Sequence, residues 1–431
     1  MLNLELFFKA KSFLNKYIDW LVVGLVALLP WQARFLWVRF NGDKVWEYGS
    51  FSIYALEILI VLTAILFIFS RGGFKKFWSS FKNSWRSGWV FLPLVLWLGA
   101  TFFWSQDLVA SLTWLSYAIT SIIFGWLLWQ LPNEKKFWAL AIASFIVSAS
   151  VIASWFTQYV PASTWLGTGE HHPAFLGQSV VQFGEWAGTN VGERWLRAYG
   201  LLPHPNVAAG FVVVLLLSLW LLAHKLNNRR VVSISLFLSA LSGAAVLATM
   251  SKSGALAIGA LAIFWLILFR DSFWKFAVAL FLGFGLFAYV AWPQVDARIK
   301  GTQTFEQFSR YERILGYEEA WQQKTWLGQG LSSSTKTMDK KVVLPPQPVH
   351  DVPLLILTEL GLVGLALAFG TFLSLVYLSR VYKTRQFWLI FLTLLPLLAF
   401  DHYLLSMFAG LILWPVILGN FKEKPAKLVW D

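Results

Sequence analysis

A histidine at the boundary between a polar segment and a membrane-length apolar run is well placed to do chemistry in this chain. His350 follows a proline-rich stretch, residues 345–348, and precedes a long apolar run that begins at Leu354. Asp351 is placed to cap a helix, and Pro353 fits its first turn, where a missing N–H costs nothing. An imidazole held where a polar loop meets the membrane indicates chemistry at the membrane surface. The plainer alternative is that His350 only caps or anchors the helix end.

The composition predicts an integral membrane protein. Of 431 residues, 58% are hydrophobic and 13% are charged, and the mean hydropathy is +0.61. A soluble domain cannot cover that much apolar surface. The net charge of +13 lies mainly in short loops between apolar runs, where it acts as a topology signal, so we expect no nucleic-acid partner. The chain has no cysteine, which excludes a thiolate nucleophile and a zinc–thiolate site.

Apolar runs predict an all-α polytopic membrane protein with about 12 transmembrane helices. The expected spans are residues 17–31, 52–70, 89–104, 111–131, 138–160, 206–223, 231–250, 254–269, 276–292, 353–378, 387–400 and 404–419. Basic clusters occur before the first span and after the second, sixth and tenth, so all lie inside if both termini are cytoplasmic. We expect residues 1–431 to form a single integral membrane domain, with the first run as an uncleaved anchor.

Three polar segments are then left facing outward, at residues 32–50, 161–205 and 293–352. The last, a large periplasmic or extracellular loop, is too long for an ordinary helix connection, and loops of that length are usually functional. Within it, Arg313, Tyr317 and Trp321 have helical spacing, so we expect short helices there. An aromatic, arginine-containing helix of this kind lies on the outer membrane surface.

Charged residues from distant parts of the chain map to this outer side. They are Arg197, Lys252, Arg310, Arg313 and His350. Arginine binds phosphate oxygens through two parallel hydrogen bonds and keeps its charge, so this convergence suits a lipid-linked diphosphate. The plainer alternative is that the arginines pair with Glu193 and Glu312 or with lipid headgroups.

Four short motifs follow one another along the same region. They are Arg197…Gly200…His204-Pro205-Asn206, Ser251-Lys252-Ser253-Gly254, Arg313…Ala320-Trp321…Leu327-Gly328-Gln329-Gly330, and His350…Glu359-Leu360-Gly361-Leu362-Val363-Gly364. In order, spacing and side of the membrane they resemble the O-antigen ligase and polymerase superfamily of bacterial envelope glycosyltransferases. The resemblance covers about residues 195–370 in motif and most of the chain in topology.

The resemblance implies a GT-C-like fold and transfer of a glycan from an undecaprenyl-diphosphate carrier to an acceptor hydroxyl, with no metal or other cofactor. It assigns His350 to the acceptor, and Arg197 and Arg313 to the diphosphate, as the catalytic residues. Substrate-binding roles fall to Arg310, Lys252, His204, Asn206, Asp351 and Tyr317. Expected partners are the lipid-linked donor, a glycan, lipid or protein acceptor, and membrane lipids.

Two departures from the family pattern bear on this assignment. The family often has arginine where this chain has Lys252, which weakens bidentate phosphate binding, and asparagine where it has Asp351, which puts a carboxylate beside the expected base. Asp401 and His402, at the last outer turn, are a further candidate cluster for a proton relay or a hard metal ion near His350.

The function predicted from the sequence is therefore that of an O-antigen ligase-type glycosyltransferase with its active site outside. A repeat-unit polymerase is the alternative within the same class. A transporter or flippase of lipid-linked saccharide is the alternative from another class, and it predicts charged or broken helices near the bilayer midplane. Glu57 is the main charged residue inside a predicted span.

Overall fold

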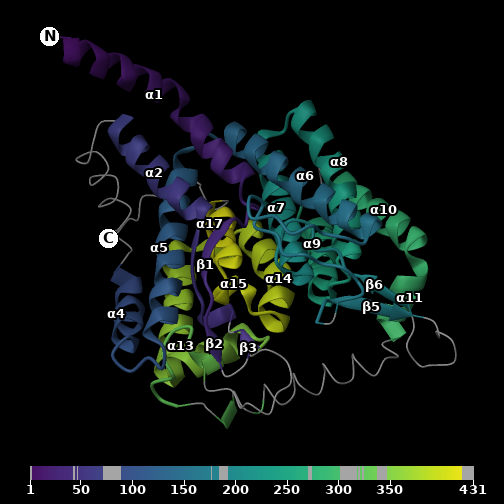
Figure 1. The fold of residues 1–431 in the computed structure, drawn as a ribbon. Helices are drawn as coiled ribbons and strands as arrows, with labels where there is room; N and C mark the ends of the chain where they lie inside the picture. Colours follow the sequence, from purple (N-terminus) through teal and green to yellow (C-terminus); the bar gives the residue numbers. More distant parts are fainter. Residues whose placement is uncertain are drawn as a thin grey trace.

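The computed structural model describes residues 2–41, 44–45, 47–70, 89–175, 177–183, 193–269, 274–300, 318, 321–322, 325–336 and 347–419, and their arrangement is shown in Figure 1. The α-helices are α1 (Leu2–Ala27), α2 (Ala55–Ser70), α4 (Leu92–Thr101), α5 (Leu108–Gln130), α6 (Asn133–Thr157), α7 (Pro205–Leu226), α8 (Arg229–Ala248), α9 (Lys252–Leu268), α10 (Trp274–Val290), α11 (Trp292–Lys300), α13 (Val352–Ser379), α14 (Arg385–Phe400), α15 (Tyr403–Ser406), α16 (Phe408–Leu411) and α17 (Leu413–Leu418). Short 3-10 turns are η1 (Glu47–Gly49), η3 (Ser334–Lys336) and η4 (Val381–Lys383).

Small antiparallel strand pairs complete the described fold. Strand β1 (Arg34–Trp37) pairs with β4 (Phe51–Tyr54), with Arg34 opposite Tyr54. Strand β2 (Phe40–Asn41) pairs with β3 (Lys44–Val45), and β5 (Val180–Phe183) pairs with β6 (Glu193–Leu196). Five of these strands fall in the segments predicted to face outward, where backbone groups need partners of their own, whereas β4 occupies the first residues of the predicted span 52–70.

Helix lengths confirm a polytopic all-α membrane protein and refine the expected number of spans. Among the described residues, five helices are long and apolar enough to cross a membrane, namely α5, α6, α7, α8 and α13. The pair α10 and α11 makes a sixth if its 92° bend is counted within one span. The other expected runs coincide with shorter apolar helices, except the first, which falls in the 26-residue α1, a helix that is not among these five. The run at residues 404–419, expected as one span, is divided into α15, α16 and α17, because Met407 takes an extended conformation between two short helices.

Helix α7 forms the centre of the bundle. In its most apolar window 94% of the residues are buried, against 39% in α5, whose remaining apolar side chains face outward as lipid contact requires. Close packing on small residues holds the neighbouring helices α8 and α10 together. A Cβ added to Gly283 would lie 1.9 Å from the carbonyl oxygen of Ala240, so this helix pair depends on glycine, as membrane helix interfaces commonly do.

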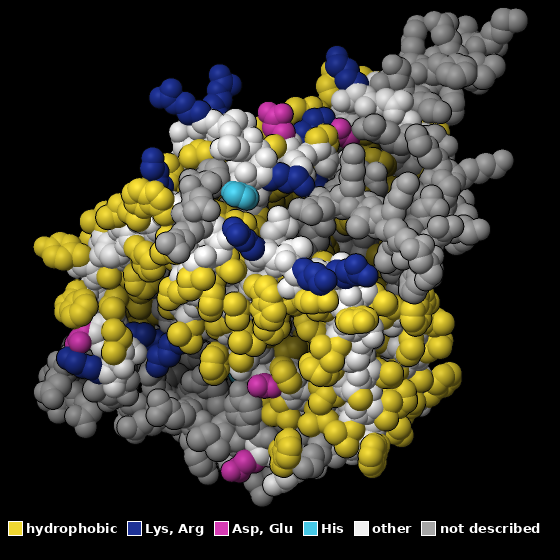
Figure 2. Space-filling view, turned by 180° about the vertical axis from the view of Figure 1, so that it is seen from behind, with side chains coloured by type: hydrophobic (Ala, Val, Ile, Leu, Met, Phe, Trp, Pro, Cys, Tyr) yellow, Lys and Arg dark blue, Asp and Glu magenta, His cyan; other side chains and the backbone are white. Residues whose placement is uncertain are grey.

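The basic clusters that follow α7 and precede α14 lie at one end of this bundle. The His224 ring packs on Phe269 at the end of α9 (ring centroids 5.1 Å apart), and Arg385 Nη1 donates to the Leu268 carbonyl (3.1 Å). Figure 2 shows Lys and Arg gathered above a broad hydrophobic band on one face of the molecule. The basic clusters after α7 and before α14 therefore lie at the same end of the bundle.

A break in α13 joins two of the sequence motifs. Gly361 has φ +72° and ψ −176°, so the helix is interrupted there. The exposed backbone groups pair with the segment 325–330: Leu362 N–H donates to the Thr325 carbonyl (3.0 Å), and Gly330 N–H donates to the Glu359 carbonyl (2.9 Å). A Cβ at Gly361 would lie 2.3 Å from the Trp326 carbonyl oxygen, so only glycine fits.

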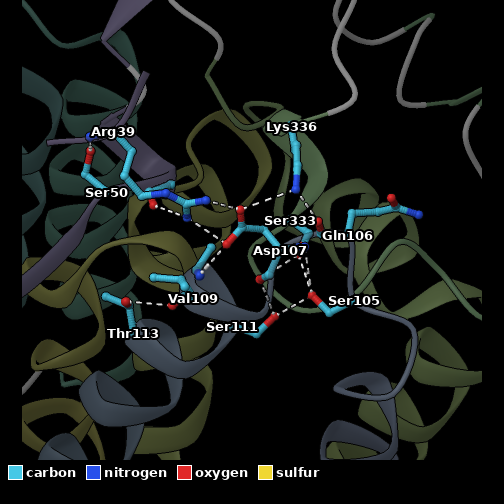
Figure 3. A network of polar contacts seen from close by, with 12 residues as sticks. Arg39, Ser50, Ser105, Gln106, Asp107, Val109, Ser111, Thr113, Ser333 and Lys336 are labelled. Atoms are coloured by element: carbon cyan, nitrogen blue, oxygen red, sulfur yellow. Dashed lines mark hydrogen bonds and ion pairs between the residues drawn. The ribbon is translucent and has the colours of Figure 1, made fainter. Parts of the chain in front are cut away.

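A second clamp holds the outer segments together around Asp107. Figure 3 shows Arg39 and Lys336 directed at this side chain, which also caps α5 by accepting from Ala110 N–H (2.9 Å), while Ser333 Oγ contacts the Asp107 backbone. Arg39 donates from both terminal nitrogens to the two carboxylate oxygens (2.7 and 2.6 Å). Burial opposes the charged carboxylate, but the hydrogen bonds from Arg39 outweigh it and lower the pKa of Asp107. Through Arg39 and Lys336, the clamp fixes the segment between β1 and β4 and the turn η3 on the N-terminal end of α5.

Candidate active site

Three helix N-termini meet at the end of the bundle opposite the basic clusters. They are those of α7, α9 and α13, capped by the side chains of His204, Ser251 and Asp351, which accept from backbone N–H groups of the first turn. Each cap satisfies a donor that the helix itself leaves unpaired. The residues next to the caps then project toward one carboxylate, that of Asp401 at the C-terminal end of α14.

Asp401 is buried and receives contacts from all three helix ends. Asn206 Nδ2 donates to Oδ1 (3.1 Å), Ser253 Oγ donates to Oδ2 (2.6 Å), and His350 Nδ1 lies 3.5 Å from Oδ1. Burial alone would raise the pKa of Asp401, but the contacts from His350 and Ser253 outweigh it and hold the pKa below its ordinary value. Asp401 is therefore an ionised carboxylate that orients the His350 ring.

His402 covers the other flank of His350. The two rings meet edge to face with centroids 4.8 Å apart, and His402 Nδ1 lies 2.6 Å from Ser406 Oγ. Burial lowers the pKa of His402 well below its ordinary value, and the neighbouring His350 lowers it further. His402 is therefore neutral near pH 7, and its ring packs against His350 in a position held by Ser406. The sequence indicated this meeting of His350, Asp401 and His402 only as one candidate, because it depends on the chain turn after α14.

Arg197 supports the site from within the protein. Its side chain is buried, with Nε donating to the Thr249 carbonyl (2.9 Å) and Nη2 donating to Asn206 Oδ1 (2.6 Å). This second contact orients the amide so that its nitrogen donates to Asp401. The structure gives Arg197 a positioning contact on Asn206, and its assignment to the diphosphate stays a prediction.

Other predicted residues take different places. His204 caps α7 and lies 3.0 Å through Nε2 from Ser179 Oγ; burial, with Arg197 nearby, lowers its pKa to about 3, so it is neutral. Lys252 is exposed in the first turn of α9. Asp351 Oδ1 accepts from Leu354 N–H (2.7 Å), so the carboxylate that approaches His350 Nδ1 is Asp401. The predicted residues Arg310, Arg313 and Tyr317 lie outside the described residues.

One cation beside the site has no counterpart in the sequence motifs. Arg298, in the last turn of α11, donates from Nε to the Met250 carbonyl (3.1 Å), directly before the cap of α9. The bend between α10 and α11 places it there. The usable signal in the sequence was the change from an apolar run to the amphipathic segment Trp292–Lys300, which contains two basic residues in its last turn.

Within the part of the chain that the structure describes, no three His, Asp or Glu side chains are grouped so that they could hold a metal ion. Hydrogen-bond donors surround Asp401 instead. The arrangement fits acid–base chemistry on His350 next to a positively polarised surface.

The comparison with protein families agrees with this reading. Residues 237–369 match the family model described as O-antigen ligase. This match supports an assignment to the O-antigen ligase superfamily. The matched stretch contains Lys252, Ser253 and His350, whereas Asn206 and Asp401 reach the site from outside it. No match to a curated protein was found.

Proposed function

We propose that this chain is a membrane glycosyltransferase that transfers a glycan from an undecaprenyl-diphosphate carrier to an acceptor hydroxyl at the outer face of the bacterial inner membrane. The observation that carries the proposal is the convergence of three helix N-termini, those of α7, α9 and α13, on the His350–Asp401 pair. The proposal also rests on the family match, which includes His350.

The helix ends supply a binding surface for the diphosphate. Each N-terminus carries the positive end of a helix dipole, about +0.5 charge, and favours anions. Lys252 adds a full charge at the start of α9, and Arg298 lies beside the same turn. Charge accumulates on a diphosphate as it leaves, so these groups stabilise the transition state more than the bound donor. We propose that Arg310 and Arg313 complete this surface from the outer loop.

His350 serves as the base for the acceptor. Asp401 faces its Nδ1, which leaves Nε2 to accept the proton of a sugar hydroxyl. As the acceptor oxygen bonds to the anomeric carbon, the bond from that carbon to the diphosphate oxygen breaks, and the diphosphate departs with the electron pair. Because diphosphate is a good leaving group, the step requires no metal ion and no general acid.

The topology that places this site outside is part of the proposal. Both termini and the loops at residues 71–88 and 379–386 would be cytoplasmic, and the segment 293–352 would be outside. We propose about 12 crossings in a single GT-C-like domain, with the shorter apolar helices counted among them. A helix of 16 or 17 residues, such as α14 or α9, is shorter than the average span and can cross where the protein thins the bilayer locally.

One observation favours the transporter alternative and must be tested. Broken helices at substrate depth are typical of transporters, and α13 is broken at Gly361 while the last apolar run is divided into short helices. In this chain Asp401 and His402, which connect α14 to the first of these short helices, contact His350. We therefore assign these breaks to building a catalytic site.

The test is transfer by the purified protein in proteoliposomes that contain a radiolabelled undecaprenyl-diphosphate glycan and the host's envelope acceptor. A labelled covalent product with release of undecaprenyl diphosphate supports the proposal, and we expect it to persist in excess EDTA. A single addition identifies a ligase, whereas a ladder of products identifies a polymerase. Movement of the donor across the bilayer without any covalent product would contradict the glycosyltransferase assignment.

A further inference from the structure

A groove on the outer face begins beside an exposed tryptophan. It lies between strand β1 and the loop at residues 162–169 and encloses about 550 Å³. Its walls combine the Trp165 ring and Leu36 with the hydroxyl-bearing Ser163, Thr164 and Thr168. The Trp165 side chain is 83% exposed. The volume is within the range that holds a small organic ligand such as one or two sugar rings.

Arg34 also lines a narrower inner pocket, which is bordered by Tyr48, Trp114, Tyr117 and Ser406. The Tyr48 ring meets the His402 ring edge to face at 5.4 Å, and Ser406 Oγ lies 2.6 Å from His402 Nδ1. Since His402 packs on His350, the side chains that border the inner pocket are separated from the proposed base by the His402 ring.

The walls of the groove are held by the backbone and by the Asp107 clamp. Gln32 N–H donates to the Leu166 carbonyl (3.2 Å), and a Cβ added to Gly167 would lie 2.0 Å from the backbone of Gln32, so loop and strand are in close contact. Arg39, which follows β1, is fixed on Asp107, as Figure 3 shows. A preformed groove costs a ligand little ordering entropy.

We propose that this groove binds the sugar rings of the acceptor glycan. A pyranose ring has apolar C–H faces and a polar hydroxyl edge, which match an aromatic wall beside Ser and Thr hydroxyls and a guanidinium. Direct displacement at the anomeric carbon requires the nucleophile on the side opposite the leaving diphosphate. Asp401 accepts from Ser253 beside a helix N-terminus, whereas the His402 ring meets Tyr48, which borders the inner pocket, so we place the diphosphate on the Asp401 side of His350 and the acceptor on the His402 side.

The inference rests on the proposed function, and it is tested through Trp165. In Trp165→Ala the acceptor KM should rise about tenfold, while kcat and the donor KM stay unchanged, because the ring contributes equally to binding in ground and transition states. Trp165→Phe should restore most of the affinity. Phe103→Ala is the matched control, because Phe103 is also an exposed aromatic residue (91%) and does not line the groove.

A binding measurement separates this inference from the proposed function. The probe is the lipid-free oligosaccharide released by mild acid from the host envelope acceptor, titrated calorimetrically into wild type and Trp165→Ala. Weaker binding to the alanine variant supports the groove as a glycan site, whether or not the wild-type protein transfers glycan. An absence of transfer by wild type would count only against the glycosyltransferase assignment. Equal binding and an unchanged acceptor KM would overturn the inference, and a raised donor KM instead would show that the groove holds the donor glycan.

Discussion

At the scale of single residues, the site combines His350, which the sequence singled out, with Asp401, which the sequence offered only as one candidate neighbour. His350 is recognisable because the polar-to-apolar boundary, the cap at Asp351 and the nearby proline are all local features. Asp401 lies 51 positions later in the numbering, and its contact with His350 (3.5 Å) requires the turn after α14 to fold back on α7. Gly210 permits this turn, since a Cβ there would lie 1.7 Å from Tyr403 Oη. Such a contact follows from packing rather than from any spacing in the chain.

Arg197 gives the first prediction at this scale. Lysine retains the charge but not the fork that reaches both the Thr249 carbonyl and Asn206, so Arg197→Lys should lower the free energy of unfolding by about 1.5–3 kcal/mol. Arg194→Lys, three residues earlier in β6 and more exposed, should change it by less than about 0.5 kcal/mol. Thermal unfolding in detergent compares the two variants. Equal effects would show that the buried fork does not stabilise the site.

His204 gives a prediction for pH dependence. Its pKa is about 3 in the folded protein, against about 6.5 for a free imidazole, so the unfolded chain binds the proton more tightly. Stability due to neutral His204 is therefore full above pH 6.5 and decreases as the pH falls from 6.5 toward 3. His204→Asn, which keeps a capping side chain, should flatten this slope between pH 7.5 and 5. An identical slope in wild type and variant would assign the acid sensitivity to other groups.

At the scale of secondary structure, the break in α13 is the feature that the sequence left unresolved. Glycines are common in membrane helices, so Gly361 within an apolar run of membrane length predicted no interruption. Its role depends on the segment 325–330, which pairs with the opened backbone. The sequence identified both stretches as motifs, yet only the folded chain shows that one is the binding partner of the other.

A pair of glycine substitutions in the same helix tests this role. Gly361→Ala forces a side chain into the left-handed region (φ +72°) and against Trp326, and should destabilise the protein by about 1–3 kcal/mol. Gly370→Ala meets no atom within 4 Å and should be neutral or stabilise by up to about 1 kcal/mol. Thermal unfolding and protease cleavage within residues 325–336 provide the measurements. A neutral Gly361→Ala would mean that the break is not required.

At the scale of the whole molecule, composition and charge alternation predicted the class and the arrangement of the two ends. Every expected apolar run overlaps a helix, and the end of α7, the end of α9 and the start of α14 meet at one end. Helix lengths were harder to predict than the apolar runs, because hydropathy does not show where the backbone bends or breaks within a run. The bend of 92° between α10 and α11 is the clearest case.

The membrane topology can be tested directly, because the chain contains no cysteine. Single cysteines in residues 71–88 and 379–386 should resist an impermeant maleimide in intact cells and react once the membrane is opened, since the basic loops are retained inside. Cysteines in residues 293–352 should react in intact cells, and they serve as the positive control. Labelling of the 71–88 loop in intact cells would reverse the topology and move the site to the cytoplasm.

The most direct test of the central claim, that His350 oriented by Asp401 carries the acceptor step, is a double-mutant cycle on the transfer rate. His350→Ala should lower the rate by about 10²–10⁴-fold while donor binding remains. Asp401→Asn acts through the same ring, so the double variant should be no slower than His350→Ala alone. His172→Ala and Asp296→Asn, outer residues away from the site, should transfer at the wild-type rate. Transfer by His350→Ala at the wild-type rate, or independent and multiplying losses in the double variant, would contradict the account.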